Sequence, residues 1–342
     1  MDFKSNNILI FFDEIQDCPK ARLSFKNDGR YNVIGSGSYL GINGYVIGDT
    51  TPAPTGYEDV MQMKTMDFEE FLWALGYKEQ QINQLATYFN DKKPIPENIH
   101  KLYKDLYLKY SCIGGFPKAI KEYLKTYRIV DAFKELNNTV FDMKTDFGRR
   151  KDKNENPFFK ANEVSRIQSV FDLIPMFLAK DNKRFIVSKV YNVEVPSLPL
   201  VGEKIESQFK LFPEDIGIVT SMYGIDTVAA INKGNLGQEK GAIYEALVFD
   251  SLNKAGIEPF YFSKESGLEI DFVISYNGYA TLIEAKAKTG NTKSSKTVMK
   301  HPEHYGKTKL IKIGDYNISE EGDIITIPHY LTFVLGKIKY DF

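Results

Sequence analysis

The chain has 342 residues, of which 43% are hydrophobic and 26% charged, a composition typical of folded proteins and a length sufficient for two or three domains. The net charge of −1 excludes a chain-wide preference for nucleic acid or membranes, so any such preference has to be local. Cys18 and Cys112 lie far apart, and no apolar stretch reaches membrane length. These features predict a cytoplasmic protein without a membrane partner.

Two apolar runs near the start, residues 8–12 and 31–34, predict buried parallel strands. The first run ends in Asp-Glu and the second in Gly-Ser-Gly-Ser. In nucleotide hydrolases such an aspartate helps to hold Mg²⁺, the glutamate polarises the attacking water, and a serine senses the terminal phosphate of ATP. Either run taken singly is more typical of an ordinary buried strand than of a nucleotide site. The candidate ATP-binding residues are Asp13, Glu14, Ser36 and Ser38.

The next part of the chain has the periodicity of helices. Asp67 and Glu70 predict a capping box for a helix that runs through Leu75 and stops at Gly76. Apolar residues recur at intervals of three and four in the segments that follow. Helices are therefore predicted over residues 79–90, 97–109, 117–126, 128–147 and 162–179.

From about residue 185 short β-branched runs replace the helical pattern. A helix is predicted within this part over residues 238–254. The predicted strands cover residues 185–195, 209–211, 216–219, 259–263, 268–276, 279–287, 310–313, 324–327 and 330–334. Helices followed by a mixed unit predict an α/β protein with at least two domains.

An acidic pair is predicted in the hairpin formed by residues 268–276 and 279–287. If Asn277-Gly278 is a two-residue turn, Asp271 and Glu284 lie directly opposite each other, because both pairs have the same sum of residue numbers. Facing carboxylates are unfavourable unless a cation or proton lies between them, and Mg²⁺ prefers oxygen ligands. Lys286 shares the face of Glu284 and is placed to orient or activate a metal-bound water. The alternative is a surface hairpin with a charge pair.

The arrangement Asp…Glu-x-Lys is the pattern of PD-(D/E)xK nucleases. In that family the helix before the hairpin supplies a further carboxylate, and Glu245 is the acid on the apolar side of helix 238–254. Eight lysines against two glutamates between residues 284 and 312 indicate a cationic patch suited to DNA, although a solvated lysine-rich surface explains it equally well. The candidate catalytic residues are Lys286, Asp271 and Glu284, and the candidate metal ligands are Asp271, Glu284 and Glu245.

Four segments together with the acidic motifs resemble one family. The segments are DEIQDCPKAR, YNVIGSGSYLGI, MDFEEFLWALG and CIGGFPKAI. They resemble the prokaryotic AAA-type ATPases that carry a C-terminal restriction-endonuclease-like domain of unknown function, and the resemblance covers nearly the whole chain. It implies an incomplete AAA/P-loop sheet in residues 1–60, a helical lid with a winged-helix-like region in 61–200, and a PD-(D/E)xK nuclease-like α/β domain in 201–342.

The chain departs from that family in its phosphate-binding loop. Its only Gly-Lys-Thr begins at Gly306, and the glycine required five positions earlier is replaced by His301. The sequence therefore resembles a truncated or split member that does not hydrolyse ATP alone. Its expected activity is Mg²⁺-dependent phosphodiester hydrolysis or DNA binding. The alternative is a non-enzymatic interaction module that binds another protein through a vestigial nuclease fold.

We expect the isolated chain to neither turn over ATP nor bind it with sub-millimolar affinity, because no glycine-rich loop supplies backbone amides and a lysine to the phosphates. Isothermal titration calorimetry with Mg-ATP measures this directly. Micromolar binding would contradict the expectation.

Overall fold

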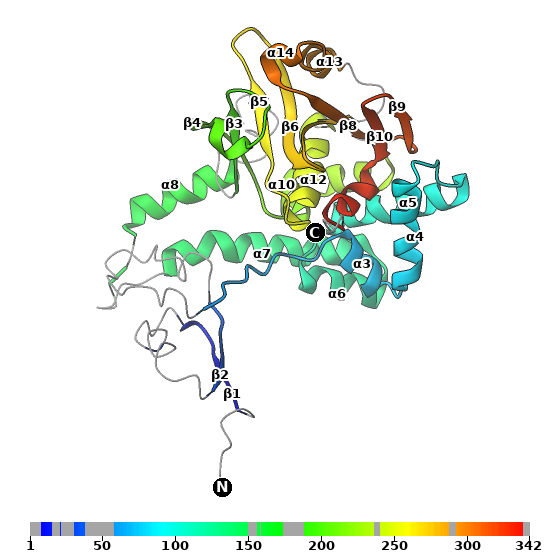
Figure 1. Cartoon of the computed structure of the whole chain (residues 1–342). Coiled ribbons are helices and arrows are strands. Elements are labelled where there is room, and N and C mark those ends of the chain that lie inside the picture. The colour runs from blue at the N-terminus through cyan, green and yellow to red at the C-terminus, as the bar shows by residue number, and fades with distance from the viewer. Residues whose placement is uncertain are drawn as a thin grey trace. The chain divides into compact units, whose positions relative to one another are not determined.

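The computed structural model describes residues 8–15, 21, 31–37, 58–149, 156–157, 159–173, 188–235, 240–286 and 292–337. The chain divides into two compact units, residues 1–64 and 65–342 (Figure 1). The sequence predicted a first boundary near residue 60 and a second near residue 200. The observed boundary, between residues 64 and 65, lies close to the first predicted boundary, and the two compact units are not divided near residue 200. None of the described helices is long and apolar enough to cross a membrane.

In the N-terminal unit, strand β1 (Leu9–Phe12) pairs in parallel with β2 (Asn32–Gly35), as the sequence predicted. The expected burial of these strands is not observed. Leu9 and Phe11 are 59% and 60% exposed, and Ile34 is 49% exposed. Within the described residues of this unit the sheet consists of these two strands.

The first part of the second unit is helical, as its periodicity predicted. The Asp67 side chain accepts a hydrogen bond from the backbone N–H of Glu70, and the Glu70 side chain accepts one from the backbone N–H of Asp67, which completes the capping box. The helix ends before Gly76, which adopts a positive φ of 90°. The helices are α3 (Phe68–Ala74), α4 (Glu79–Asn90), α5 (Glu97–Ile113), α6 (Pro117–Thr126), α7 (Ile129–Arg149) and α8 (Ala161–Asp172). Part of the predicted winged-helix-like region, residues 174–187, lies outside the described residues.

Eight strands form one mixed sheet in the order β4-β3-β5-β6-β7-β8-β10-β9. Strands β7, β8 and β10 run parallel, whereas β6 and β7 form an antiparallel hairpin. Because β3 pairs with both β4 and β5, the sheet continues across the boundary predicted near residue 200. The strands are β3 (Ser188–Val193), β4 (Lys204–Phe212), β5 (Phe260–Ser263), β6 (Glu269–Tyr276), β7 (Tyr279–Ala285), β8 (Thr308–Gly314), β9 (Ser319–Glu321) and β10 (Ile324–Pro328).

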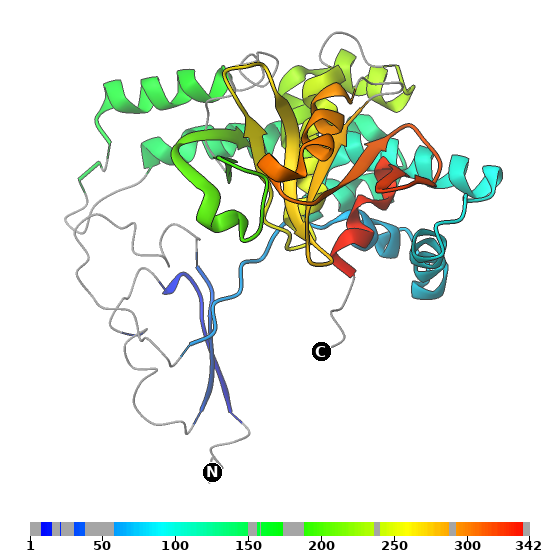
Figure 2. The same cartoon turned by 45° about the horizontal axis from the view of Figure 1, so that its top comes forward.

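Helices cover both faces of this sheet. Ile283 of β7 belongs to the large core formed with helix α12 (Lys240–Lys254). Its neighbour Leu282 belongs to a second core that contains Val298 of helix α13 (Lys293–Lys300). Because successive residues of a strand point to opposite faces, α12 and α13 pack on opposite sides of the sheet. In Figure 2, α13 lies in front of the strands and α12 behind them.

Two predicted strands are helical. Residues 216–219 lie in helix α10 (Ile216–Tyr223), and residues 330–334 lie in the 3₁₀ helix η5 (His329–Lys337). Both segments are short apolar runs that are buried on all sides, so their sequence lacks the polar face that distinguishes a helix from a strand. The remaining short elements are η4 (Leu200–Glu203), α11 (Ile225–Asn232) and α14 (Pro302–Tyr305).

A buried polar cluster joins the helical part to α12. The ammonium group of Lys254 lies 3.0 Å from a carboxylate oxygen of Asp215 and 2.9 Å from one of Asp250. It also lies 2.9 Å from the hydroxyl of Tyr110, which itself is 2.9 Å from the carbonyl oxygen of Met66. Burial works against the charge of Lys254, but the two carboxylates outweigh burial and raise its pKa. Buried charges require such partners.

Two consecutive glycines allow the chain to approach this cluster closely. A Cβ atom on Gly114 would lie 2.2 Å from a carboxylate oxygen of Asp215, and one on Gly115 would lie 2.0 Å from the carbonyl oxygen of Met66. The N–H of Gly115 donates to Asp215 over 2.8 Å. The Gly-Gly pair of the CIGGFPKAI segment therefore has a structural role.

Replacing Lys254 with Met should destabilise the protein by about 3–5 kcal/mol, because it leaves two neighbouring carboxylates buried without their cation. Urea unfolding measures the free-energy difference. The exposed Lys233→Met serves as the control and should change stability by no more than about 0.5 kcal/mol. Equal losses in both variants would contradict the role of the cluster.

Candidate functional site: an acidic pair bridged by a lysine

The β6–β7 hairpin has the register that its turn predicted. Asn277 and Gly278 both adopt positive φ, 49° and 75°, as a two-residue type I′ turn requires. The strand pairs continue from Tyr276 opposite Tyr279 to Phe272 opposite Ile283. Asp271 and Glu284 are the next positions along the two strands, and both carboxylates contact Lys286.

Lys286 bridges the two carboxylates. Its Nζ lies 2.7 Å from an oxygen of Glu284 and 3.2 Å from Oδ2 of Asp271. The same Asp271 oxygen accepts a 2.8 Å hydrogen bond from the backbone N–H of Ala285, and the hydroxyl of Ser295 donates to Oε1 of Glu284. The carboxylates are therefore held by strand β7 and helix α13.

Within this group of three charged residues, the surroundings of Glu284 disfavour its ionised form. Burial, followed by the neighbouring charge of Asp271, raises the pKa of Glu284, although Lys286 and Ser295 oppose the shift. For Lys286 burial works against the charged form, but the two carboxylates outweigh it and raise its pKa. The side chains of Asp271 and Lys286 are 19% and 22% exposed, compared with 4% for Glu284, so solvent reaches the group from their side.

Glu245 does not join this group. It is buried on α12, where its Oε1 lies 3.3 Å from Nζ of Lys210, and the same ammonium is 2.7 Å from Glu269. Lys210 also lies over the ring of Tyr261, which belongs to the core on the α12 side of the sheet. Glu284 contacts α13 on the other side.

Accordingly, within the described residues no three His, Cys, Asp or Glu side chains are grouped to hold a metal ion. The predicted three-carboxylate set is thus not assembled as expected. Asp271 and Glu284 remain as two neighbouring carboxylates, with Lys286 supplying positive charge between them.

A further residue near Lys286 is His329, which is buried in η5 and was not predicted from the sequence. Its ring stacks between Tyr244 and Tyr107, with centroids 4.5 Å and 6.4 Å away, and its Nε2 lies 3.2 Å from the carbonyl oxygen of Lys286. Its Nδ1 is buried without a hydrogen-bond partner in the described part of the chain. Burial lowers the pKa of His329 to about 4. No local sequence pattern marks this residue, because its partners are distant in the chain.

The structure also brings together two of the residues predicted to bind ATP. At the carboxyl ends of β1 and β2, the hydroxyl of Ser36 donates to Oδ1 of Asp13 over 2.5 Å. Glu14 follows with a positive φ of 49°, and its N–H lies 3.2 Å from the same Asp13 oxygen. Ser38 lies outside the described residues.

Helix α13 presents a lysine-rich surface. Lys293, Lys296 and Lys300 are exposed and lie within an arc of about 60° on the helix. On the opposite side of the helix Ser295 and Val298 are buried, and Ser295 is the residue that contacts Glu284. One helix therefore links the acidic pair to a cationic surface.

The free energy of unfolding should fall as the pH is lowered from about 6.5 to about 4. In this range His329 is protonated in the unfolded chain but stays neutral in the folded protein, where burial lowers its pKa to about 4. Between about pH 7 and pH 4.5 this residue should account for about 2 kcal/mol. His329→Phe should remove that part of the pH dependence, as measured by urea unfolding, whereas the exposed His304→Phe should retain it. Parallel pH profiles for wild type and His329→Phe would contradict the assignment.

Comparison with known proteins bears on the C-terminal part. Residues 240–330 match a family described as Domain of unknown function (DUF4143), which is associated with AAA-ATPase-like proteins. No curated protein matches the chain. A structural similarity to Can2 from Sulfobacillus thermosulfidooxidans in complex with cyclic tetra-adenylate has 10% identity over 97% of this chain and 91% of that one. Its TM-score of 0.22 is too low to carry an argument. The DUF4143 match spans α12 to β10 and includes the acidic pair, Lys286 and His329.

Proposed function

We propose that the C-terminal part acts on nucleic acid as a Mg²⁺-dependent phosphodiesterase of the PD-(D/E)xK type. The observation that carries this proposal is the position of Lys286, whose Nζ lies 3.2 Å from Asp271 and 2.7 Å from Glu284 on the adjacent strand. Two acids and a lysine in this order on a hairpin provide the groups that such chemistry uses.

The chemistry of the acidic pair fits a divalent cation. Mg²⁺ in proteins is often held by one or two carboxylates, with waters and substrate phosphates completing its coordination. Asp271 and Glu284 would supply those carboxylates. Burial, followed by the charge of Asp271, raises the pKa of Glu284, and a cation beside the pair would oppose both effects. A bound Mg²⁺ would polarise a phosphoryl oxygen and favour ionisation of water.

The surrounding residues have separate tasks in this proposal. Ser295 and the N–H of Ala285 orient the two carboxylates, since each donates a hydrogen bond to one of them. Lys286 carries the proton in this proposal. Its ammonium, which contacts the two carboxylates, can instead donate a hydrogen bond to a phosphate oxygen or to an attacking water. Its partial exposure gives a substrate access to that ammonium.

The lysines of α13 support a phosphodiester substrate. Lys293, Lys296 and Lys300 are exposed on the helix whose Ser295 contacts the acidic pair. Exposed lysines in a row bind a phosphate backbone without reading its sequence. DNA is therefore the substrate class that we propose first.

For the N-terminal unit we propose half of a nucleotide site. Asp13 and Ser36 are in hydrogen-bond contact at the carboxyl ends of two parallel strands, where α/β proteins bind ligands. The association of DUF4143 domains with AAA-ATPase-like proteins supports this assignment. Because the printed sequence contains no phosphate-binding loop, we do not propose ATP hydrolysis by this chain alone.

A second candidate function is a non-enzymatic interaction module that binds another protein. The contacts of Lys286 favour this function, because its ammonium already neutralises much of the charge of the acidic pair. In addition, the hydroxyl of Ser295 donates a hydrogen bond to one oxygen of Glu284. In this case the three charged residues would hold the open end of the hairpin together, and the nuclease-like arrangement would be vestigial.

Thermal melts with Mn²⁺ and with EDTA distinguish these functions. If the site binds metal, Mn²⁺ should stabilise the wild type by about 2.7 kcal/mol when present at about 100 times its dissociation constant. Glu284→Gln should abolish the difference between the two melts. Lys286→Ala should keep or increase this difference, because the competing ammonium is gone, but should abolish Mn²⁺-dependent cleavage of DNA.

Matched controls are available on the exposed surface. Glu321→Gln and Lys233→Ala carry the same changes away from the acidic pair, and both should behave as wild type. A wild-type melt that Mn²⁺ does not shift, together with an absence of cleavage, would reject the phosphodiesterase and leave the interaction module. A shift without cleavage would reject catalysis while retaining the metal site.

A further inference from the structure

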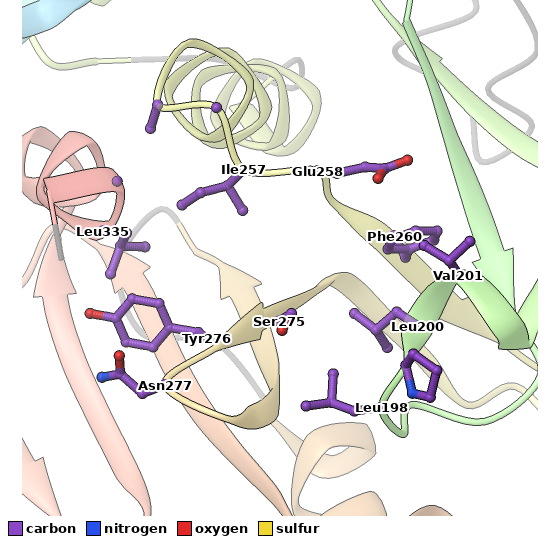
Figure 3. A pocket seen from close by; sticks show the side chains of 14 residues that line it. Leu198, Leu200, Val201, Ile257, Glu258, Phe260, Ser275, Tyr276, Asn277 and Leu335 are labelled. Carbon is purple, nitrogen blue, oxygen red and sulfur yellow. The ribbon is translucent and has the colours of Figure 1, made fainter. Parts of the chain in front are cut away.

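A cavity of about 440 Å³ lies at the turn end of the β6–β7 hairpin (Figure 3). Segments distant in sequence form it: the chain around η4, the end of α12, strand β5, the hairpin turn and the end of η5. Its volume lies within the range of about 300–1,000 Å³ that is typical of small-molecule sites. The residues that line it include Leu198, Val201, Phe260, Leu335, Glu258 and Ser275.

This cavity is separate from the acidic pair. Ser275 lines it, whereas Asp271 lies four residues earlier on the same strand. At about 3.3 Å per residue, the two positions are about 13 Å apart along β6. A ligand in the cavity would therefore not contact the acidic pair directly.

Most of the cavity wall is apolar. Phe260 and Leu335 are buried in the protein and line the cavity, whereas Leu198 and Val201 are 40% and 64% exposed at its edge. Figure 3 shows Leu198, Val201 and Phe260 on the side opposite Leu335. Covering exposed apolar side chains around a cavity with an apolar group is favourable, because it removes apolar surface from water. The wall therefore favours a ligand with an apolar body.

The charge at the cavity is negative. Glu258 is the charged residue among the described residues that line it, and no cation lies within ion-pair distance of its carboxylate in the described structure. Lys204 interacts with Glu258 electrostatically, but its hydrogen bond goes to Glu206 over 3.0 Å. The carboxyl end of α12, at Ala255, also lines the cavity and carries the negative end of the helix dipole.

We propose that this cavity binds a small organic cation, in which an apolar body about the size of one aromatic ring carries an amine. The apolar body contacts Phe260 and Leu335, and the ammonium group faces Glu258 and the end of α12. Ser275, in the middle of the cavity in Figure 3, supplies a hydroxyl to the ligand.

Three probes with a shared body test the charge preference: 2-phenylethylamine, 2-phenylethanol and phenylacetate. Ligand-observed NMR titration of the full chain should show binding of the amine with a dissociation constant on the order of 1 mM. The amine should bind about two- to fivefold more tightly than the alcohol, as expected for a partly exposed ion pair, and the carboxylate most weakly.

Three variants locate the binding. Ser275→Phe should fill the cavity and abolish binding, and this exposed position should tolerate the larger side chain. Glu258→Gln should remove the preference for the amine while retaining the alcohol. Glu265→Gln, the same change at an exposed position outside the cavity, should leave the order unchanged.

No binding of the amine to wild type would overturn the proposal, and so would the same amine affinity in wild type and in a folded Ser275→Phe. Equal affinities of the three probes for wild type would also overturn it, because the charge argument would fail. The melting temperature of each variant verifies folding, and Glu258→Gln provides a second test if Ser275→Phe does not fold.

Discussion

The ammonium group of Lys254 lies at the junction of the helical part and the sheet, with a side chain that is only 1% exposed. Its bonds to Asp215, Asp250 and Tyr110 connect three helices, α10, α12 and α5. A buried ion pair adds little net stability compared with apolar residues of similar size, but leaving one partner uncompensated is costly. The cluster therefore acts chiefly as a constraint, since arrangements that separate these helices expose unpaired charges.

This constraint determines the form of the neighbouring segments. Asp215 caps α10 through a 2.8 Å hydrogen bond from the N–H of Gly217, and Asp250 accepts the N–H of Ile216 over 3.1 Å. The start of that apolar run is thereby made helical rather than extended. Because α12 is fixed against the helical part, its other residues cover one face of the sheet. Glu245 is consequently directed to Lys210 rather than to the acidic pair.

The opposite face of the same sheet carries the proposed chemistry. Glu284 and its partner Ser295 lie where β7 meets α13, and Lys286 extends from the end of that strand. The same contacts serve both proposed functions, because a lysine that can handle a proton also neutralises two acids when no substrate is present. The acidic pair lies at one end of the hairpin and the apolar cavity at the other, so a ligand at the cavity would influence the pair only through the strands between them.

Local interactions determined what could be predicted from the sequence. Helices 79–90 and 117–126, the Asp67 capping box and the hairpin register depend on residues close in the chain, and the structure has all of them. Asp271 and Glu284 were placed opposite each other because the turn alone sets that register. Helix α12 also contained a signal that went unused: Asp250 and Lys254 are spaced as an i,i+4 pair within an apolar helix.

The remaining features were decided by the tertiary structure. Whether residues 216–219 formed a strand or a helix depended on a capping partner and on burial from all sides, neither of which is encoded in a short apolar run. The partner of Glu245 depended on the face that α12 covers, and the position of His329 depended on two tyrosines far away in the chain. Sequence spacing determines which side chains share a strand or a helical face, but only packing determines which faces meet.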